Sequence, residues 1–177
     1  ANITPSQPAT GSVSLSAKKA AALVPINNEL MRNPSVGADT LVRDDLVAAM
    51  ARKRDLSFFR GAGDQYQPRG MKLRMASANA VAMTGTPTTT TKIGDLIGLV
   101  ALVDGADVDL SSGGFAMSPR TYWGLWKSLD GNAQFVFAQM LAAGSLFGFK
   151  VGRSTQIPYN VGGGSESEVY FGAFSDA

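Results

Sequence analysis

The 177-residue chain contains no cysteine and no histidine. Without cysteine there is no disulfide framework, thiolate nucleophile or cysteine-bound metal, and without histidine no imidazole can act as a catalytic base or a zinc ligand. Most enzyme classes that depend on a catalytic triad or dyad are therefore excluded. The sequence predicts a protein that is not an enzyme and that uses no cofactor and no metal.

Long apolar runs are also missing. No stretch approaches the roughly 18 apolar residues that a membrane-spanning helix needs, and residues 1–5 do not begin a secretion signal. The net charge of +2 and the 45% content of hydrophobic residues are typical of a soluble globular protein without a membrane partner. The length fits one domain, with or without an extension. The first residue is alanine, which indicates either a processed product or removal of an initiator methionine.

The clearest pattern is an apolar stripe at helical spacing that begins at about residue 35 or 39 and ends at about residue 56. Its members are Val42, Leu46, Ala49, Met50 and Leu56. Such a stripe predicts an amphipathic helix, and about eighteen residues of helix would span about 27 Å. The glycine-containing stretch 61–70 follows and predicts a turn-rich loop.

Other segments mix helical and strand patterns. The predicted helices cover 93–105 and the residues after Ser118-Pro119, where serine is the expected N-cap and proline occupies the first helical position. The threonine-rich stretch 84–91 is expected to be a loop or an edge strand. Further expectations, in chain order, are an arm over 1–11, strands within 12–17 and 20–24, a helical turn over 27–32, and strands over 115–117, 135–137, 147–151 and 169–174. The mixture predicts an α+β fold.

Three motifs that could carry chemistry fail on their details. Gly61-Ala62-Gly63 lacks the third glycine of a dinucleotide-binding loop and follows a predicted helix when it should precede one. Asp104, Asp107 and Asp109 suggest calcium ligands, but an EF-hand loop would need glycine at Ser112 and glutamate at Ser118. The string Ser16-Ala17-Lys18-Lys19 has neither of the partner motifs of penicillin-recognising enzymes.

A basic segment runs from Arg52 to Arg74. It holds seven basic residues and two acidic ones: Arg52, Lys53, Arg54, Arg60, Arg69, Lys72 and Arg74, against Asp55 and Asp64. A positive surface of this kind could contact another subunit or nucleic acid, although the simpler interpretation is a solvated helix end. No aromatic residues alternate with the basic ones to indicate specific nucleic-acid recognition.

The aromatic residues of the predicted helix after Pro119 are the second candidate surface. Trp123 and Trp126 cannot both lie centrally on the stripe that Tyr122, Leu125 and Leu129 define. One of the two tryptophans is therefore expected to be partly exposed, and an exposed tryptophan is a good interface anchor.

The order of four segments resembles the major capsid proteins of tailed phages and prophages, which share the shell fold named after phage Hong Kong 97. Residues 19–30 are similar to the strand that leads from the extended loop into the peripheral domain, and residues 42–63, followed by 67–71, to the spine helix and its glycine loop. Residues 116–132 are similar to a strand–helix unit of the axial domain, and 146–151 and 168–175 to its closing strands.

The resemblance implies a division of the chain and a truncation at both ends. Residues 1–17 would be an arm and the end of the extended loop, 18–75 a partial peripheral domain with the spine helix, and 76–177 a mixed-sheet axial domain flanked by helices. Family members carry a longer extended loop and return to the peripheral sheet after the last axial strand. The chain is therefore expected to be a fragment, and the family's lysine–asparagine cross-link is assigned to no residue here.

The function that the resemblance implies is that of a structural subunit whose partners are further copies of itself. Such subunits assemble into pentamers and hexamers that enclose the genome in the virion capsid, after assembly in the host cytoplasm. The resemblance also leaves open packaged DNA as a further partner, which the subunit would contact nonspecifically. The alternatives are a different phage structural or receptor-binding protein and, as a more distant candidate, a hydrolase that works without histidine.

Overall fold

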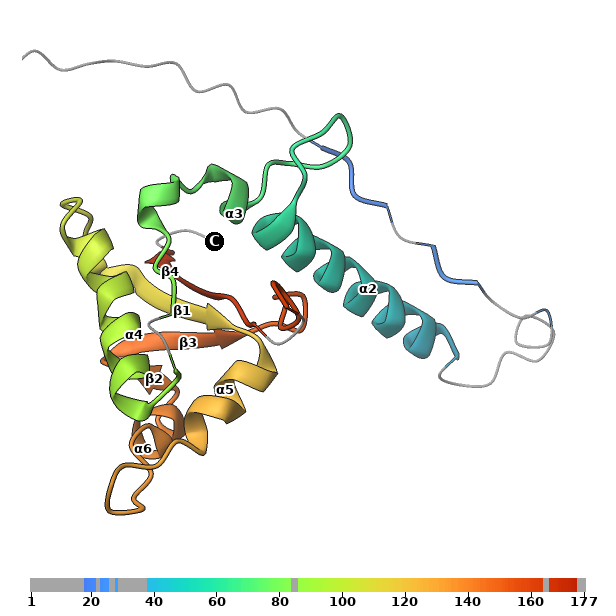
Figure 1. The fold of residues 1–177 in the computed structure, drawn as a ribbon. Helices are drawn as coiled ribbons and strands as arrows, with labels where there is room; N and C mark the ends of the chain where they lie inside the picture. The colour runs from blue at the N-terminus through green and yellow to red at the C-terminus, as the bar shows by residue number, and fades with distance from the viewer. Residues whose placement is uncertain are drawn as a thin grey trace, which may run out of the picture.

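The computed structural model describes residues 18–21, 23–25, 28, 38–83, 86–163 and 166–174. In these residues three helices cover one face of a four-stranded sheet, and one long helix projects to the side (Figure 1). The α+β class predicted from the sequence is confirmed. The predicted arm and the strand within 12–17 lie outside the described residues, as does all of the predicted turn at 27–32 except Asn28.

The sheet has the order β2-β3-β1-β4. Its strands are β1 (Gly113–Met117), β2 (Ser145–Leu146), β3 (Phe149–Arg153) and β4 (Val169–Ala173). The central strand β1 runs parallel to β3 and antiparallel to β4. All five of its residues are buried, which agrees with the buried strand predicted at 115–117.

The large core lies on the face of the sheet to which Phe115 and Met117 point. Successive side chains of a strand point to opposite faces, so these two share a face that Ala116 does not. Helices α4 (Thr89–Asp104), α5 (Pro119–Trp126) and α6 (Ala138–Ala142) contribute to this core. Its buried members are Leu96, Phe115, Met117, Tyr122, Leu125, Phe137, Leu141 and Leu146. Ala116 and Tyr170 belong to a smaller cluster with Phe59 and Ile157.

The long helix α2 (Ala38–Arg60) confirms the strongest sequence pattern and runs four residues beyond its predicted end. The added turn includes Phe59, which is buried against the sheet. Helix α3 (Met71–Arg74) follows the glycine-containing loop, where the sequence predicted turns. The strand predicted within 20–24 is absent from the described residues of that stretch, none of which belongs to a strand.

The threonine-rich stretch corrects the sequence prediction, because its second half begins helix α4. Thr88 is the N-cap: the backbone N–H of Thr91 donates to its hydroxyl oxygen at 3.2 Å, and the Thr88 N–H donates to Oγ1 of Thr91 at 2.9 Å. This reciprocal capping box satisfies backbone donors at the helix start. Four consecutive threonines favoured a loop or an edge strand in the sequence analysis. In the structure Thr88 and Thr91 instead cap the helix.

Helix α5 begins as predicted, with the Ser118 hydroxyl accepting from the N–H of Thr121 and proline at the first helical position. It ends at Trp126, before Leu129. The strand predicted over 135–137 is wrong. Phe135 makes only an isolated bridge with Leu129, and Phe137 precedes α6, a helix that the sequence did not predict.

The strand predicted over 147–151 begins two residues late, as β3, because a tight hairpin turn occupies its first two positions. Leu146 pairs with Phe149, so Phe147 and Gly148 are the two turn residues. Both have positive φ, 52° and 87°, as a two-residue turn of type I′ requires. The predicted strand over 169–174 is confirmed and ends one residue early, as β4.

Candidate assembly surface

The C-terminal end of α2 is where the long helix meets the sheet. The Phe59 ring centroid lies 5.2 Å from that of Tyr170, and the Phe58 centroid lies 6.4 Å from that of Phe174. One turn earlier, the Ser154 hydroxyl donates to Oδ2 of Asp55 at 2.7 Å. These contacts attach the last turns of the helix to β4 and to the loop after β3.

Glu168, just before β4, accepts hydrogen bonds from three elements. Nη1 of Arg60, at the end of α2, donates to its two carboxylate oxygens at 2.9 and 3.2 Å. Nζ of Lys72 in α3 donates to Oε1, and the Tyr170 hydroxyl donates to Oε2 at 2.7 Å. We call this group, Arg60, Lys72, Glu168 and Tyr170, the Glu168 joint.

The surroundings of Glu168 shift two pKa values. Partial burial alone would raise the pKa of Glu168, but hydrogen bonds from Lys72 and Tyr170 and the charges of Arg60 and Lys72 outweigh it, so the pKa is lowered. The pKa of Tyr170 is raised, first by burial and then by its hydrogen bond to the Glu168 carboxylate. The carboxylate therefore stays ionised, and the phenol protonated, at neutral pH.

The glycine loop between α2 and α3 brings Lys72 to this joint. The N–H of Gly61 donates to the Ser57 carbonyl at 3.0 Å, and the N–H of Gly70 donates to the Gly61 carbonyl at 2.9 Å. A β-carbon at Gly61 would collide with the carbonyl oxygens of Ser57 and Pro68. Glycine is required here because the two backbone segments touch.

The basic segment predicted as a contact surface divides into two groups. Arg60 and Lys72 are joined to Glu168 within the chain. Arg52, Lys53, Arg54, Arg69 and Arg74 are exposed, although Nε of Arg74 donates to the Arg69 carbonyl at 3.1 Å. The exposed group remains a prediction for contact with another subunit or with nucleic acid.

Most of α2 lies away from the sheet. Phe59 is the one buried hydrophobic residue among its described side chains. The predicted stripe is only partly covered: Val42, Leu46 and Ala49 are half-buried, whereas Met50 and Leu56 are exposed. A helix with this much exposed apolar surface gains little stability from its own chain.

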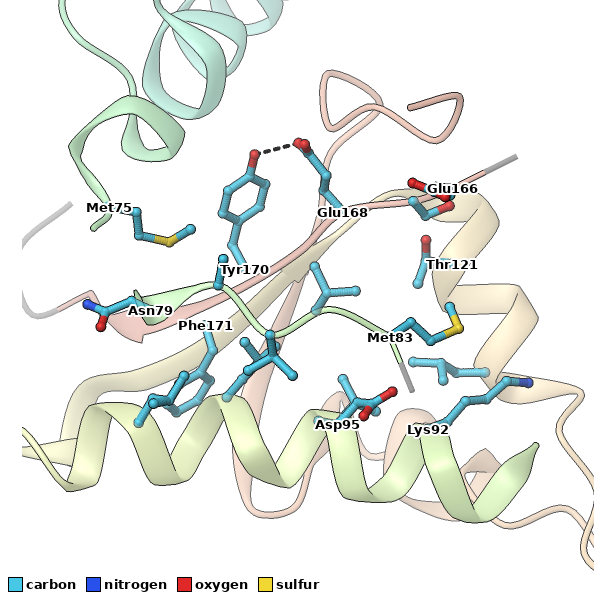
Figure 2. A pocket seen from close by; sticks show the side chains of 18 of the residues that line it. Met75, Asn79, Met83, Lys92, Asp95, Thr121, Glu166, Glu168, Tyr170 and Phe171 are labelled. Carbon is cyan, nitrogen blue, oxygen red and sulfur yellow. Dashed lines mark hydrogen bonds between the residues drawn. The ribbon is translucent and has the colours of Figure 1, made fainter. Parts of the chain in front are cut away.

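A cavity of about 870 Å³ lies between α4, α5, β4 and the segment 75–83 that crosses above them (Figure 2). Met75 and Met83 of the crossing segment, and Phe171 of β4, contribute to its largely apolar lining. Tyr170 and Glu168 lie at its edge, where the dashed line in Figure 2 marks their hydrogen bond. The cavity therefore adjoins the Glu168 joint.

The described residues contain no group of three or more carboxylates or other side chains placed to hold a metal ion. This includes Asp104, Asp107 and Asp109, which the sequence suggested as calcium ligands. Asp109 instead accepts from the N–H and the hydroxyl of Ser111 at 2.9 and 2.8 Å, and the N–H contributes most to lowering its pKa. No helix in the described part of the chain is both long and apolar enough to span a membrane.

Comparison with known proteins identifies the class. The model of the phage capsid family matches residues 1–177, and the chain belongs to that family. The chain is similar to the major capsid protein of Klebsiella oxytoca phage phiKO2, with 36% identity over 171 residues. The match covers 93% of this chain and 39% of the relative, so the chain spans about two fifths of the relative's length.

The sequence marked Arg60 and Lys72, the two basic residues of the Glu168 joint, but it did not mark Glu168 itself. Glu168 lies 108 residues from Arg60 and 96 from Lys72. The local sequence around it, Ser167-Glu168-Val169-Tyr170, shows only an acidic residue at the start of a strand. An ion pair over such a separation leaves no local pattern, and a single sequence does not reveal paired positions.

Proposed function

We propose that this chain forms part of a structural, shell-forming subunit of a phage or prophage capsid. The observation that carries the proposal is the match of the phage capsid family over all 177 residues. The similar phiKO2 protein is a major capsid protein. The proposed role needs no catalytic group, consistent with a sequence that lacks cysteine and histidine.

We further propose that the subunit has the Hong Kong 97-type fold, with α2 as the spine helix and residues 76–177 as the axial domain. Two features support this division: α2 is attached to the sheet mainly through its last turns, and much of its apolar surface is exposed. In the proposed assembly, pentamers and hexamers close a shell through repeated contacts that are individually weak.

The test is assembly of the protein expressed from its complete reading frame. Electron microscopy and sedimentation velocity should detect ring-shaped capsomers or closed shells above a threshold protein concentration. A protein that stays monomeric under all conditions of salt and concentration would contradict the proposal. Turnover in a substrate screen that disappears on replacing one serine or aspartate would favour a hydrolase.

A further inference from the structure

Helix α5 presents an exposed tryptophan between two positive charges. Trp123 is 54% exposed, and Arg120 and Lys127, three residues before and four after it, are exposed on the same side of the helix. Tyr122 and Leu125 are buried in the large core. The sequence predicted that one of two tryptophans would be exposed, and the structure identifies it as Trp123, because Trp126 packs against the core.

Arg120 connects this helix face to a second exposed aromatic ring. Its Nη1 donates to the Tyr159 carbonyl at 2.7 Å, and its guanidinium carbon lies 5.7 Å from the centroid of the Tyr159 ring. Tyr159 is itself 51% exposed. We call Arg120, Trp123, Lys127 and Tyr159 the tryptophan face. Tryptophan, tyrosine and arginine are the residue types that most often dominate binding energy at protein interfaces.

The connection after α4 is negatively charged, in contrast to the positively charged tryptophan face. Asp104, Asp107 and Asp109 lie within residues 102–109, a stretch that contains no lysine or arginine. Leu102 and Val108 in the same stretch are 39% and 41% exposed. We call residues 102–109 the acidic turn. It combines exposed apolar side chains with negative charge, which complements the exposed aromatic rings and positive charge of the tryptophan face.

Helix stability does not explain the position of these carboxylates. Asp104 is the last residue of α4, and the C-terminus of a helix carries a partial negative charge that disfavours a carboxylate. Asp107 has a positive φ of 55° and its N–H donates to the Asp104 carbonyl at 3.0 Å, so the turn has a defined backbone. The carboxylates and the helix end therefore add to one negative potential.

The two surfaces lie at opposite ends of the same strand. The acidic turn leads through a short 3-10 helix, Leu110–Ser112, into β1, and α5 begins two residues after β1 ends. Five residues of strand span roughly 16 Å. Figure 1 shows the end of α4 near the start of β1 and helix α5 beyond the other end of that strand. The surfaces are therefore too far apart to meet within one chain, and each is free to meet the other on a second copy.

We propose that the acidic turn of one copy docks on the tryptophan face of the next. This inference rests on the proposed function, and it specifies the partner and the two surfaces. Because the surfaces differ and lie at opposite ends of β1, the contact is head-to-tail, so every docked copy offers a free tryptophan face or a free acidic turn to the next. Repetition of such a contact generates rings when the rotation closes.

The test uses protein from the complete reading frame in sedimentation velocity at low and high salt. Trp123→Ala should raise the dissociation constant for self-association about 30-fold, the scale of an interface hot spot. Asp104→Lys combined with Val108→Ala should weaken association on the other surface, and the new lysine suits the end of α4. Tyr66→Ala, at a tyrosine that is 75% exposed in the glycine loop, is the matched control and should have no effect.

Mixing the two variants tests the head-to-tail geometry. The Trp123→Ala protein keeps an intact acidic turn, and the Asp104→Lys/Val108→Ala protein keeps an intact tryptophan face. Each alone should remain monomeric at concentrations where the equimolar mixture forms heterodimers and nothing larger. A mixture that stays monomeric would overturn the pairing of these surfaces, as would an oligonucleotide that binds the tryptophan face while Trp123→Ala leaves self-association unchanged.

Failure of the inference can be distinguished from failure of the proposed function. If both variants form capsomers as readily as the unmodified protein, the inference is wrong and the capsid role stands. If the unmodified protein does not self-associate under any condition, the proposed function falls, and the inference with it. Circular dichroism and thermal unfolding of each variant check that it is folded.

Discussion

One face of the sheet, where Phe115 and Met117 point, is covered by α4, α5 and α6, whereas the face of Ala116 and Tyr170 meets the end of α2 and Ile157. The first face is covered by segments that are close in sequence and that pack together as one apolar core. On the second face a small apolar cluster is supplemented by the charged Glu168 joint. The comparison suggests that the first face gives the chain its stability, while the second fixes where α2 points.

The largest expected effect is on the well-covered face. Phe115 is 1% exposed, and its ring centroid lies 4.7 Å from that of Phe171 and 6.4 Å from that of Phe149. Phe115→Ala should lower the free energy of unfolding by about 3–5 kcal/mol, because it leaves a cavity in the core. Urea denaturation followed by circular dichroism measures the loss. A change below about 1 kcal/mol would show that the large core is not the main source of stability.

The glycine loop should be the next most sensitive position. Gly61→Ala should cost about 1–3 kcal/mol, because the new methyl group collides with backbone carbonyl oxygens. Gly94→Ala is the matched control within α4, where nothing lies within 4 Å of an added β-carbon; it should stabilise the protein by about 0.5–1 kcal/mol through helix propensity. Equal effects of the two substitutions in thermal unfolding would contradict the close packing of the loop.

The Glu168 joint should contribute less to the free energy of unfolding than Phe115 or the glycine loop. Glu168→Gln removes the charge that Arg60 and Lys72 share, at a site that remains partly exposed, and should cost about 1–2 kcal/mol. Hydrogen exchange should increase in the last turns of α2 and in α3 and change little in β1. Glu166→Gln, at an exposed residue two positions away, is the control. Uniformly faster exchange across the sheet would mean that the joint does not act locally.

The same joint predicts a pH dependence. Because the pKa of Glu168 is lowered from its ordinary value of 4.5, the ionised carboxylate contributes stability that is fully present above pH 4.5 and is lost as the pH falls through the lowered pKa. The difference in unfolding free energy between the unmodified protein and Glu168→Gln should therefore be constant from pH 7 to about 5.5 and shrink toward pH 3. A difference that grows on acidification would contradict the lowered pKa of Glu168.

The smallest expected effect lies on the exposed part of α2. Leu41 is 61% exposed, so Leu41→Ala should change the unfolding free energy of the isolated chain by less than about 0.5 kcal/mol. The measurement is urea denaturation at a protein concentration where the chain is monomeric. A loss as large as that of Phe115→Ala would show that α2 has a buried partner within the chain.

Local chemistry made several elements predictable from the sequence. Ser118-Pro119 specifies the start of α5, and the stripe from Val42 to Leu56 specifies a helix, because caps and periodicity involve residues only three or four positions apart. The same reasoning failed at Phe135–Phe137, where three apolar residues suggested a strand. A short apolar run fits a strand or a helix entry equally well until its neighbours are known.

The candidate surfaces were predictable in part. The sequence marked the basic segment and an exposed tryptophan, but not which basic residues are already paired or which tryptophan is exposed. Arg60 and Arg52 look alike in the sequence, and only the fold brings Glu168 to one of them. Trp123 and Trp126 differ because the core contacts one side of α5.

The sequence by itself determined the long helix α2, the start of α5, the buried central strand and the absence of histidine and cysteine chemistry. Tertiary structure alone decided the joint at Glu168, whose partners are about a hundred residues away in the chain, and the turn at Phe147, where a phenylalanine adopts a positive φ. The physical reason is the same in both cases. Backbone caps and periodicity act between neighbours, whereas ion pairs and unfavourable backbone angles are stabilised by contacts that exist only after the sheet has formed.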